Sequence, residues 1–212
     1  MAEESASIDG TERLVMFSDG VIAIAITLLV LDIRLPELPE RVDSAALATA
    51  LIAIMPKIAA YALSFLVIGE FWYVHRIRFS YINRCDATLI WLNMLFLMTI
   101  GFVPFASSVL SEHANATAYL LYDGTMICAA LLSAALWGYA IIGNRLVPPE
   151  LSAEIRRRSL VAPLRVAAVF VLSAVLAQID VREARWAWLL LIPAAVEWHG
   201  RRRGRHNRET RT

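Results

Sequence analysis

The stretch ATLIWLNMLFLMTIGFVPFASSVLS, residues 87–111, decides the fold class of this chain. It runs for 25 residues without Asp, Glu, Lys or Arg, and a helix of about 20 apolar residues is long enough to cross the hydrocarbon core of a bilayer. Residues 124–144 are similarly free of charged side chains. The sequence therefore predicts an all-α membrane protein.

The composition points to the same class of protein. Of the 212 residues, 58% are hydrophobic and only 18% are charged, which is far more apolar than a water-soluble domain. Six spans of about 20 residues each leave room for loops but not for a second domain. We therefore expect one six-helix transmembrane domain over residues 1–212, with spans at about 14–35, 45–74, 87–111, 120–144, 160–179 and 184–199 and a basic tail at 200–212.

The arginines predict how the spans are oriented. Six spans place both termini on one side, and that side receives 15 arginines against 4 on the other. Loops rich in Lys and Arg stay in the cytoplasm, so we expect a multi-pass protein of the cell (inner) membrane with both termini cytoplasmic. The arginine-rich tail is interpreted as a topology anchor rather than as a nucleic-acid or anionic-lipid site.

The sequence gives little support for an enzyme. It contains no H-E-x-x-H, G-x-S-x-G or P-loop motif, and its two cysteines lack the spacing of a metal site. We expect no cofactor and no resident metal. Ionisable residues inside spans are costly and indicate function or pairing between helices; those that need an explanation are Asp19, Lys57, Glu70 and His75.

The first span carries a stripe of side chains at helical spacing. Ile24, Leu28 and Leu31 are related as i, i+4 and i+7, and Thr27 lies one turn above Ile24. Spacing alone favours a face that contacts lipid or packs against another helix over a face that lines a pore.

The segment RLVMFSDG, residues 13–20, carries a more specific signal. It closely resembles the R-x-x-x-F-S-D-G signature of the transmembrane protein 175 family, which comprises potassium channels of lysosomes and bacteria. The length of the chain matches a bacterial subunit with one six-helix repeat, whereas animal members carry two repeats. The resemblance therefore extends over nearly the whole chain.

The resemblance implies a homotetramer with a central pore lined by the first helix, conducting potassium without a T-V-G-Y-G filter loop. It places the hydrophobic constriction at Ile24, Leu28 and Leu31 and a selectivity layer at Thr27. It also implies that polar signature residues hold the pore helix to neighbouring helices. The signature positions and the partners expected for Asp19 are Arg13, Phe17, Ser18, Asp19, Gly20, His75 and Asn93.

Several alternatives stay open on the sequence. Asp19 belongs either to a structural network or to a carboxylate ring that attracts cations at the pore mouth, and Asp32 is a candidate for the outer mouth. His75 is either a fixed hydrogen-bond partner or a sensor of cytoplasmic pH. The expected partners are potassium ions, lipid and further copies of the chain. The competing functions are a proton- or cation-coupled transporter that uses Asp19, Glu70 and His75, and a scaffold that conducts nothing.

Overall fold

The computed structural model describes residues 2–39 and 42–191, and all regular structure within these ranges is helical. The α-helices and 3₁₀ turns are α1 (Ala2–Leu28), η1 (Leu29–Asp32), α2 (Ser44–Ala53), α3 (Met55–Phe79), α4 (Ala87–His113), α5 (Ala116–Ile141), η2 (Ile142–Asn144), α6 (Ala153–Ile179), α7 (Val181–Ala187) and η3 (Trp188–Leu190).

Five helical segments within the described residues are long and apolar enough to cross a membrane. They are Gly10–Asp32, Met55–Phe79, Ala87–His113, Ala116–Asn144 and Ala153–Ile179. The sixth expected span, 184–199, starts within α7 and η3, but its second half and the basic tail at 200–212 lie outside the described residues. The structure is thus that of an all-α multi-pass membrane protein.

The second expected span, 45–74, is divided in the structure. A break at Ile54 separates α2 from α3, and the membrane-length segment runs from Met55 to Phe79. Pro56 lies in the first turn of α3, where its missing N–H and fixed φ are tolerated, whereas proline inside a continuous helix would clash with the preceding turn. Lys57 follows this break, and its Nζ atom lies 3.8 Å from Glu112 Oε1 of α4.

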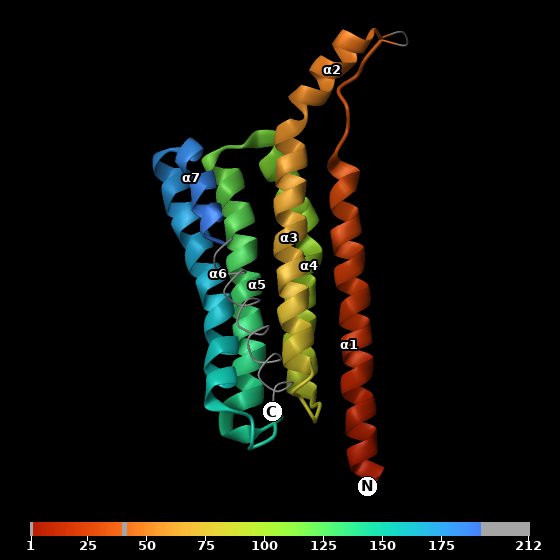
Figure 1. Ribbon diagram of the computed structural model, residues 1–212, viewed down its shortest axis with the longest axis vertical. Helices are drawn as coiled ribbons and strands as arrows, with labels where there is room; N and C mark the ends of the chain where they lie inside the picture. The colour runs from red at the N-terminus through yellow and green to blue at the C-terminus, as the bar shows by residue number, and fades with distance from the viewer. Residues whose placement is uncertain (1, 40–41, 192–212) are drawn as a thin grey trace, which may run out of the picture.

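The helices form a bundle in which α1 occupies an edge (Figure 1). α5 packs against α4 and α6, while α1 contacts α3 and α4. α2 projects beyond the end of the bundle, as Figure 1 shows. The core is filled by large side chains with less than 2% exposure, among them Ile68, Phe96, Tyr122, Trp137 and Phe170.

Local capping fixes where several helices begin. Asp86 accepts a hydrogen bond from the backbone N–H of Leu89 at the start of α4, and Asn115 accepts one from Ala118 at the start of α5. Such caps satisfy N–H groups that have no partner within the helix. Ala114 adopts a left-handed conformation with φ 40° between these helices, so the chain reverses within two residues and α5 returns alongside α4.

Candidate functional site

The first helix presents two different faces. One face is a seam of buried residues that packs onto α3 and α4; it consists of Thr11, Leu14, Ser18, Ile22, Ala25 and Leu29. The spacings along this seam are three or four residues, which keeps it on one side of a helix that packs lengthwise against its neighbours. The seam explains how α1 is attached to the bundle.

A second face of α1 is exposed. Along it, and continuing into η1, lie Arg13, Phe17, Gly20, Ile24, Thr27, Leu28 and Leu31, called here the exposed stripe; Met16 and Val30 beside them are exposed as well. Ile24 is 61% exposed, Leu28 44% and Leu31 63%. The residues named from the sequence as constriction and selectivity layer therefore lie together on a surface that nothing else in the described chain covers.

Thr27 makes a hydrogen bond within its own helix. Its Oγ1 atom donates to the carbonyl oxygen of Ile24 at 2.9 Å. A hydroxyl has one proton and two lone pairs, so this bond uses the proton. What Thr27 offers to its surroundings is therefore an acceptor oxygen.

The signature residue Ser18 lies on the buried seam and joins a polar network. Ser18 Oγ donates to the carbonyl oxygen of Leu14 at 2.7 Å and accepts from Asn93 Nδ2 at 2.8 Å. Asn93 Oδ1 in turn lies 2.9 Å from His75 Nε2. The chain of contacts crosses from α1 through α4 to α3, and Ser18 and Asn93 have no exposed surface.

His75 is held by aromatic rings as well as by Asn93. Its ring stacks on Phe79 with centroids 4.1 Å apart and on Phe96 with centroids 5.7 Å apart. The side chain is only 3% exposed. Packing on two sides fixes the ring orientation, which suits a hydrogen-bond partner with a constant geometry.

Asp19 has a different partner from those expected. The sequence nominated His75 and Asn93, but the indole N–H of Trp72 donates to Asp19 Oδ1 at 2.7 Å, whereas His75 and Asn93 join Ser18. The indole also lies under the guanidinium of Arg76, whose Cζ is 5.6 Å from the ring centroid. Trp72 is thus a site residue that the sequence analysis missed, although it lies one helical turn from His75.

The remaining signature residues lie outside this network. Arg13 and Gly20 are exposed, Phe17 is 51% exposed, and a Cβ atom built at Gly20 would meet nothing within 4 Å. Of the signature, the structure therefore brings Ser18 and Asp19 into contacts between helices and leaves the other three positions on the exposed stripe.

Asp32, the candidate for an outer mouth, is bound to α4. Its Oδ1 accepts a hydrogen bond from Ser108 Oγ at 2.6 Å, and its Oδ2 accepts one from Ser111 Oγ at 3.0 Å. Both carboxylate oxygens are engaged, and the side chain faces α4 rather than the exposed stripe. Asp32 thus attaches the C-terminal end of the first span to α4.

Two buried ionisable residues were not identified from the sequence as site candidates. Arg78 in the last turn of α3 is 3% exposed, and Asp123 on α5 has no exposed surface. A signal for Asp123 exists, because it lies within the expected span 120–144, and an ionisable residue in a span indicates function or pairing. Arg78 gives no comparable signal, since arginines at the ends of spans are common.

Comparisons with known proteins show which family this chain resembles. The family profile described as endosomal/lysosomal potassium channel TMEM175 matches residues 13–104. A protein of Streptomyces collinus named as a potassium channel is 41% identical over 150 residues, which cover 68% of this chain and 71% of that protein. A protein of Chamaesiphon minutus named as a potassium channel is 38% identical over 141 residues, 65% of this chain and 69% of that protein.

The fold is similar to a solved structure over almost its whole length. The crystal structure of a lysosomal potassium-selective channel TMEM175 homolog from Chamaesiphon minutus superposes with a TM-score of 0.78 and 28% sequence identity, covering 90% of this chain and 99% of that chain. The match over 71% of a relative that is 41% identical is decisive. This chain belongs to the TMEM175 potassium channel family.

Proposed function

We propose that this chain is the subunit of a homotetrameric potassium channel whose central pore is lined by the exposed stripe of α1. The observation that carries the proposal is the 61% exposure of Ile24 and 63% exposure of Leu31 on a helix whose buried seam already packs onto the bundle. Two relatives named as potassium channels, and the solved potassium-selective homolog, support the choice of ion.

The exposed stripe is suited to contact between identical helices. Its members Arg13, Phe17, Gly20, Ile24 and Thr27 follow one another at intervals of four, three, four and three residues. This near-heptad spacing keeps the exposed stripe facing a common axis along the length of the helix. Subunits related by cyclic symmetry present the same surface to that axis, so four stripes would enclose one continuous path.

The apolar members of the stripe would form the constriction. A ring of four Ile24 side chains, followed by rings of Leu28 and Leu31, offers no hydrogen bond to a hydrated ion. Narrow hydrophobic constrictions gate by expelling water. Conduction then requires the ring to widen, and the closed state needs no charged side chain at the gate.

Thr27 would supply the cation preference. Because its proton is used in the bond to the carbonyl oxygen of Ile24, the oxygen lone pairs are the part left to meet an ion. Four such oxygens on one level favour a partly dehydrated cation over an anion. The geometry therefore fits potassium permeation without a backbone-carbonyl filter.

We also propose that the N-terminal end of α1 faces the cytoplasm. Arg13 lies near the start of the first membrane-length segment, and Arg76 and Arg84 lie in the last turn of α3 and in the loop after it, with Arg145 and Arg156 further along the chain. The excess of arginines on this side is what the positive-inside rule expects for cytoplasmic loops. The same rule supports a cytoplasmic C-terminal tail and insertion in the cell (inner) membrane.

The second candidate function, a transporter coupled through Asp19, Glu70 and His75, has less support. Asp19 accepts a hydrogen bond from Trp72, and His75 is stacked between rings and bonded to Asn93. A coupled carrier needs such groups to change partners during each cycle. These contacts instead suit residues that hold helices in fixed positions.

The test is a reversal-potential measurement in planar bilayers under a potassium gradient against sodium. Three proteins are compared: the natural chain, Ile24→Asn and Ala23→Asn. Ala23 is exposed at the same depth as Ile24, but it points about 100° away around the helix. We expect potassium-selective current in all three, and altered conductance in Ile24→Asn alone.

Each alternative has its own result. A flux that saturates and requires a second ion, and that disappears in Glu70→Gln, would replace the channel by the transporter. Equal effects of Ile24→Asn and Ala23→Asn would show that the exposed stripe does not line the pore. Absence of current from purified tetramers of all three proteins would favour the alternative that the chain is a scaffold and conducts nothing.

A further inference from the structure

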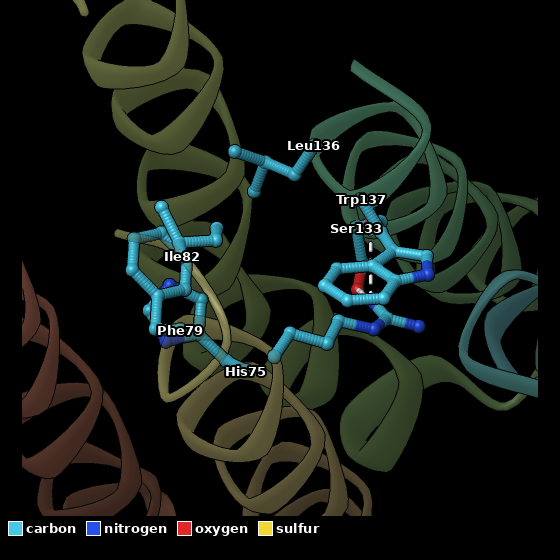
Figure 2. A pocket seen from close by; sticks show the side chains of 7 residues that line it. His75, Phe79, Ile82, Ser133, Leu136 and Trp137 are labelled. Atoms are coloured by element: carbon cyan, nitrogen blue, oxygen red, sulfur yellow. Dashed lines mark hydrogen bonds between the residues drawn. The ribbon is translucent and has the colours of Figure 1, made fainter. Parts of the chain in front are cut away.

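Two polar networks end at one small cavity near the end of α3. The first network runs from Ser18 through Asn93 to His75, and the second centres on Arg78. The cavity is lined by His75, Arg78, Phe79, Ile82, Ser133, Leu136 and Trp137. Figure 2 shows His75 and Phe79 on one side and Ser133 and Trp137 across from them.

The first network fixes which nitrogen of His75 carries a proton. Ser18 Oγ donates its only proton to the carbonyl oxygen of Leu14, so it must accept from Asn93 Nδ2. This orients the amide of Asn93 with Oδ1 toward His75 Nε2. Nε2 is therefore the donor, and Nδ1 of the neutral ring presents a lone pair. Nδ1 is buried and has no hydrogen-bond partner in the described chain.

The second network leaves one donor of Arg78 unused. Nη1 donates to the carbonyl oxygen of Ser133 at 2.9 Å and to Ser133 Oγ at 2.6 Å, and Nη2 donates to the carbonyl oxygen of Ser159. Nε–H is buried without a partner among the described residues. Within the described chain, a buried donor and a buried acceptor thus stand without partners on two residues that line one cavity. Such unpartnered groups are costly, so a molecule that pairs with both would stabilise the fold.

The size of the cavity selects what can join these two atoms. It leaves about 10 Å³ for the centre of a water-sized sphere, which is about the space that one water molecule needs. We propose that this cavity binds one ordered water molecule, which accepts a hydrogen bond from Arg78 Nε–H and donates one to His75 Nδ1. A chloride ion would match Arg78, but it would face the lone pair of His75.

The water unites the two networks into one. A continuous chain of hydrogen bonds then leads from Ser18 on α1 through α4 and α3 to Ser133 on α5 and Ser159 on α6. Arg78 becomes a positioning residue for the first helix, because through the water it adds a second hydrogen-bond partner to the His75 ring that Asn93 and Ser18 connect to α1. The inference stands on these contacts alone and does not require the proposed pore.

The first test reads the protonation of His75 directly. The protein is labelled with ¹⁵N-histidine, the other three histidines are replaced by Asn, and the two ring nitrogens are observed by NMR. We expect a protonated Nε2 and an unprotonated Nδ1 whose shift marks a hydrogen-bonded lone pair. A protonated Nδ1 would overturn the proposal, because the water would then have no acceptor there.

Cavity-filling variants test the water itself. Leu136 lines the cavity, whereas Leu131 on the same helix is 50% exposed. We expect Leu136→Phe to shift Nδ1 to the value of a lone pair without a hydrogen bond, and Leu131→Phe to leave it unchanged. An unchanged Nδ1 in a folded Leu136→Phe protein would contradict a bound water.

An experimental structure of the natural chain keeps the proposal testable if Leu136→Phe fails to fold. We expect one density peak at about 2.7–3.2 Å from both Arg78 Nε and His75 Nδ1. Crystals grown in bromide separate the two possible ligands. An anomalous peak at this position would show that the cavity binds an anion, and the absence of any peak would show that it binds nothing. Either of these results would refute the water.

Discussion

The centre of the signature network is Asn93, and its replacement by leucine tests how α1 is held. The side chain has no exposed surface, and it bridges Ser18 on α1 and His75 on α3 with contacts of 2.8 and 2.9 Å. Leucine has a similar volume but cannot form hydrogen bonds. Asn93→Leu therefore removes two polar contacts while it preserves the packing of α4.

The expected loss of stability follows from the hydrogen bonds that each partner of Asn93 loses. Hydrogen bonds between transmembrane helices contribute about 0.6 kcal/mol on average and up to about 1.7 kcal/mol. Ser18 keeps its bond to the carbonyl oxygen of Leu14, so it loses little. The donor on His75 has no second partner, and a buried donor left alone costs about 1–3 kcal/mol. We expect Asn93→Leu to lower the free energy of unfolding by about 1–3 kcal/mol.

A double-mutant cycle separates this cost from simple repacking. His75→Phe removes the stranded donor, and phenylalanine can keep the stacking on Phe79 and Phe96. Replacing both polar partners by apolar groups is often nearly neutral. We therefore expect Asn93→Leu/His75→Phe to be more stable than the sum of the two single variants implies, by about 1 kcal/mol.

The assay is reversible unfolding in mixed micelles with increasing denaturing detergent, followed by helix content. Asn83→Leu is the control, since Asn83 is an exposed asparagine in the loop after α3; we expect no change from it. Strict additivity of the two single variants, or an Asn93→Leu protein as stable as the control, would refute the network as the attachment of α1.

Two further variants probe the charged residues of the spans by the same assay. Trp72→Phe removes the donor to Asp19 at 2.7 Å and should cost about 1–3 kcal/mol because the acceptor is charged; the exposed Trp91 gives the matched Trp91→Phe control, and equal behaviour of both would count against the contact. Lys57→Met should cost less than about 1 kcal/mol, since Lys57 and Glu112 are 3.8 Å apart with side chains 27% and 48% exposed; loss of conduction in that variant would instead assign Lys57 a functional role.

Much of the fold was predictable because it depends on patterns that are local in sequence. The absence of charge over residues 87–111 predicted the span that the structure contains as α4. The break between α2 and α3 was less accessible, because Pro56 allows either a kink or a new helix start. The sequence around Pro56 does not decide between them.

The shared face of the candidate pore residues was predictable, because neighbouring turns of one helical segment supply it; their role in a pore stays a prediction. Ile24, Thr27 and Leu31 share the exposed stripe because spacing along α1 dictates it. Contacts between helices are different, since no rule of spacing connects Asp19 to Trp72, 53 residues later. Arg78 was missed for the same reason, because its partners on α5 and α6, Ser133 and the carbonyl oxygen of Ser159, lie 55 and 81 residues further along the chain.

The distribution of polar contacts along α1 has a mechanical consequence. Ser18 and Asp19 bind α4 and α3 near one end of the span, and Asp32 binds α4 at the other. Between these anchors the buried seam holds only Ile22, Ala25 and Leu29. Apolar contact between helices gains little over contact with lipid chains. The stretch between these anchors, where Ile24 lies, is therefore the part of the first span whose sideways movement costs least. The gate proposed at Ile24 would then widen while the hydrogen bonds at both ends persist.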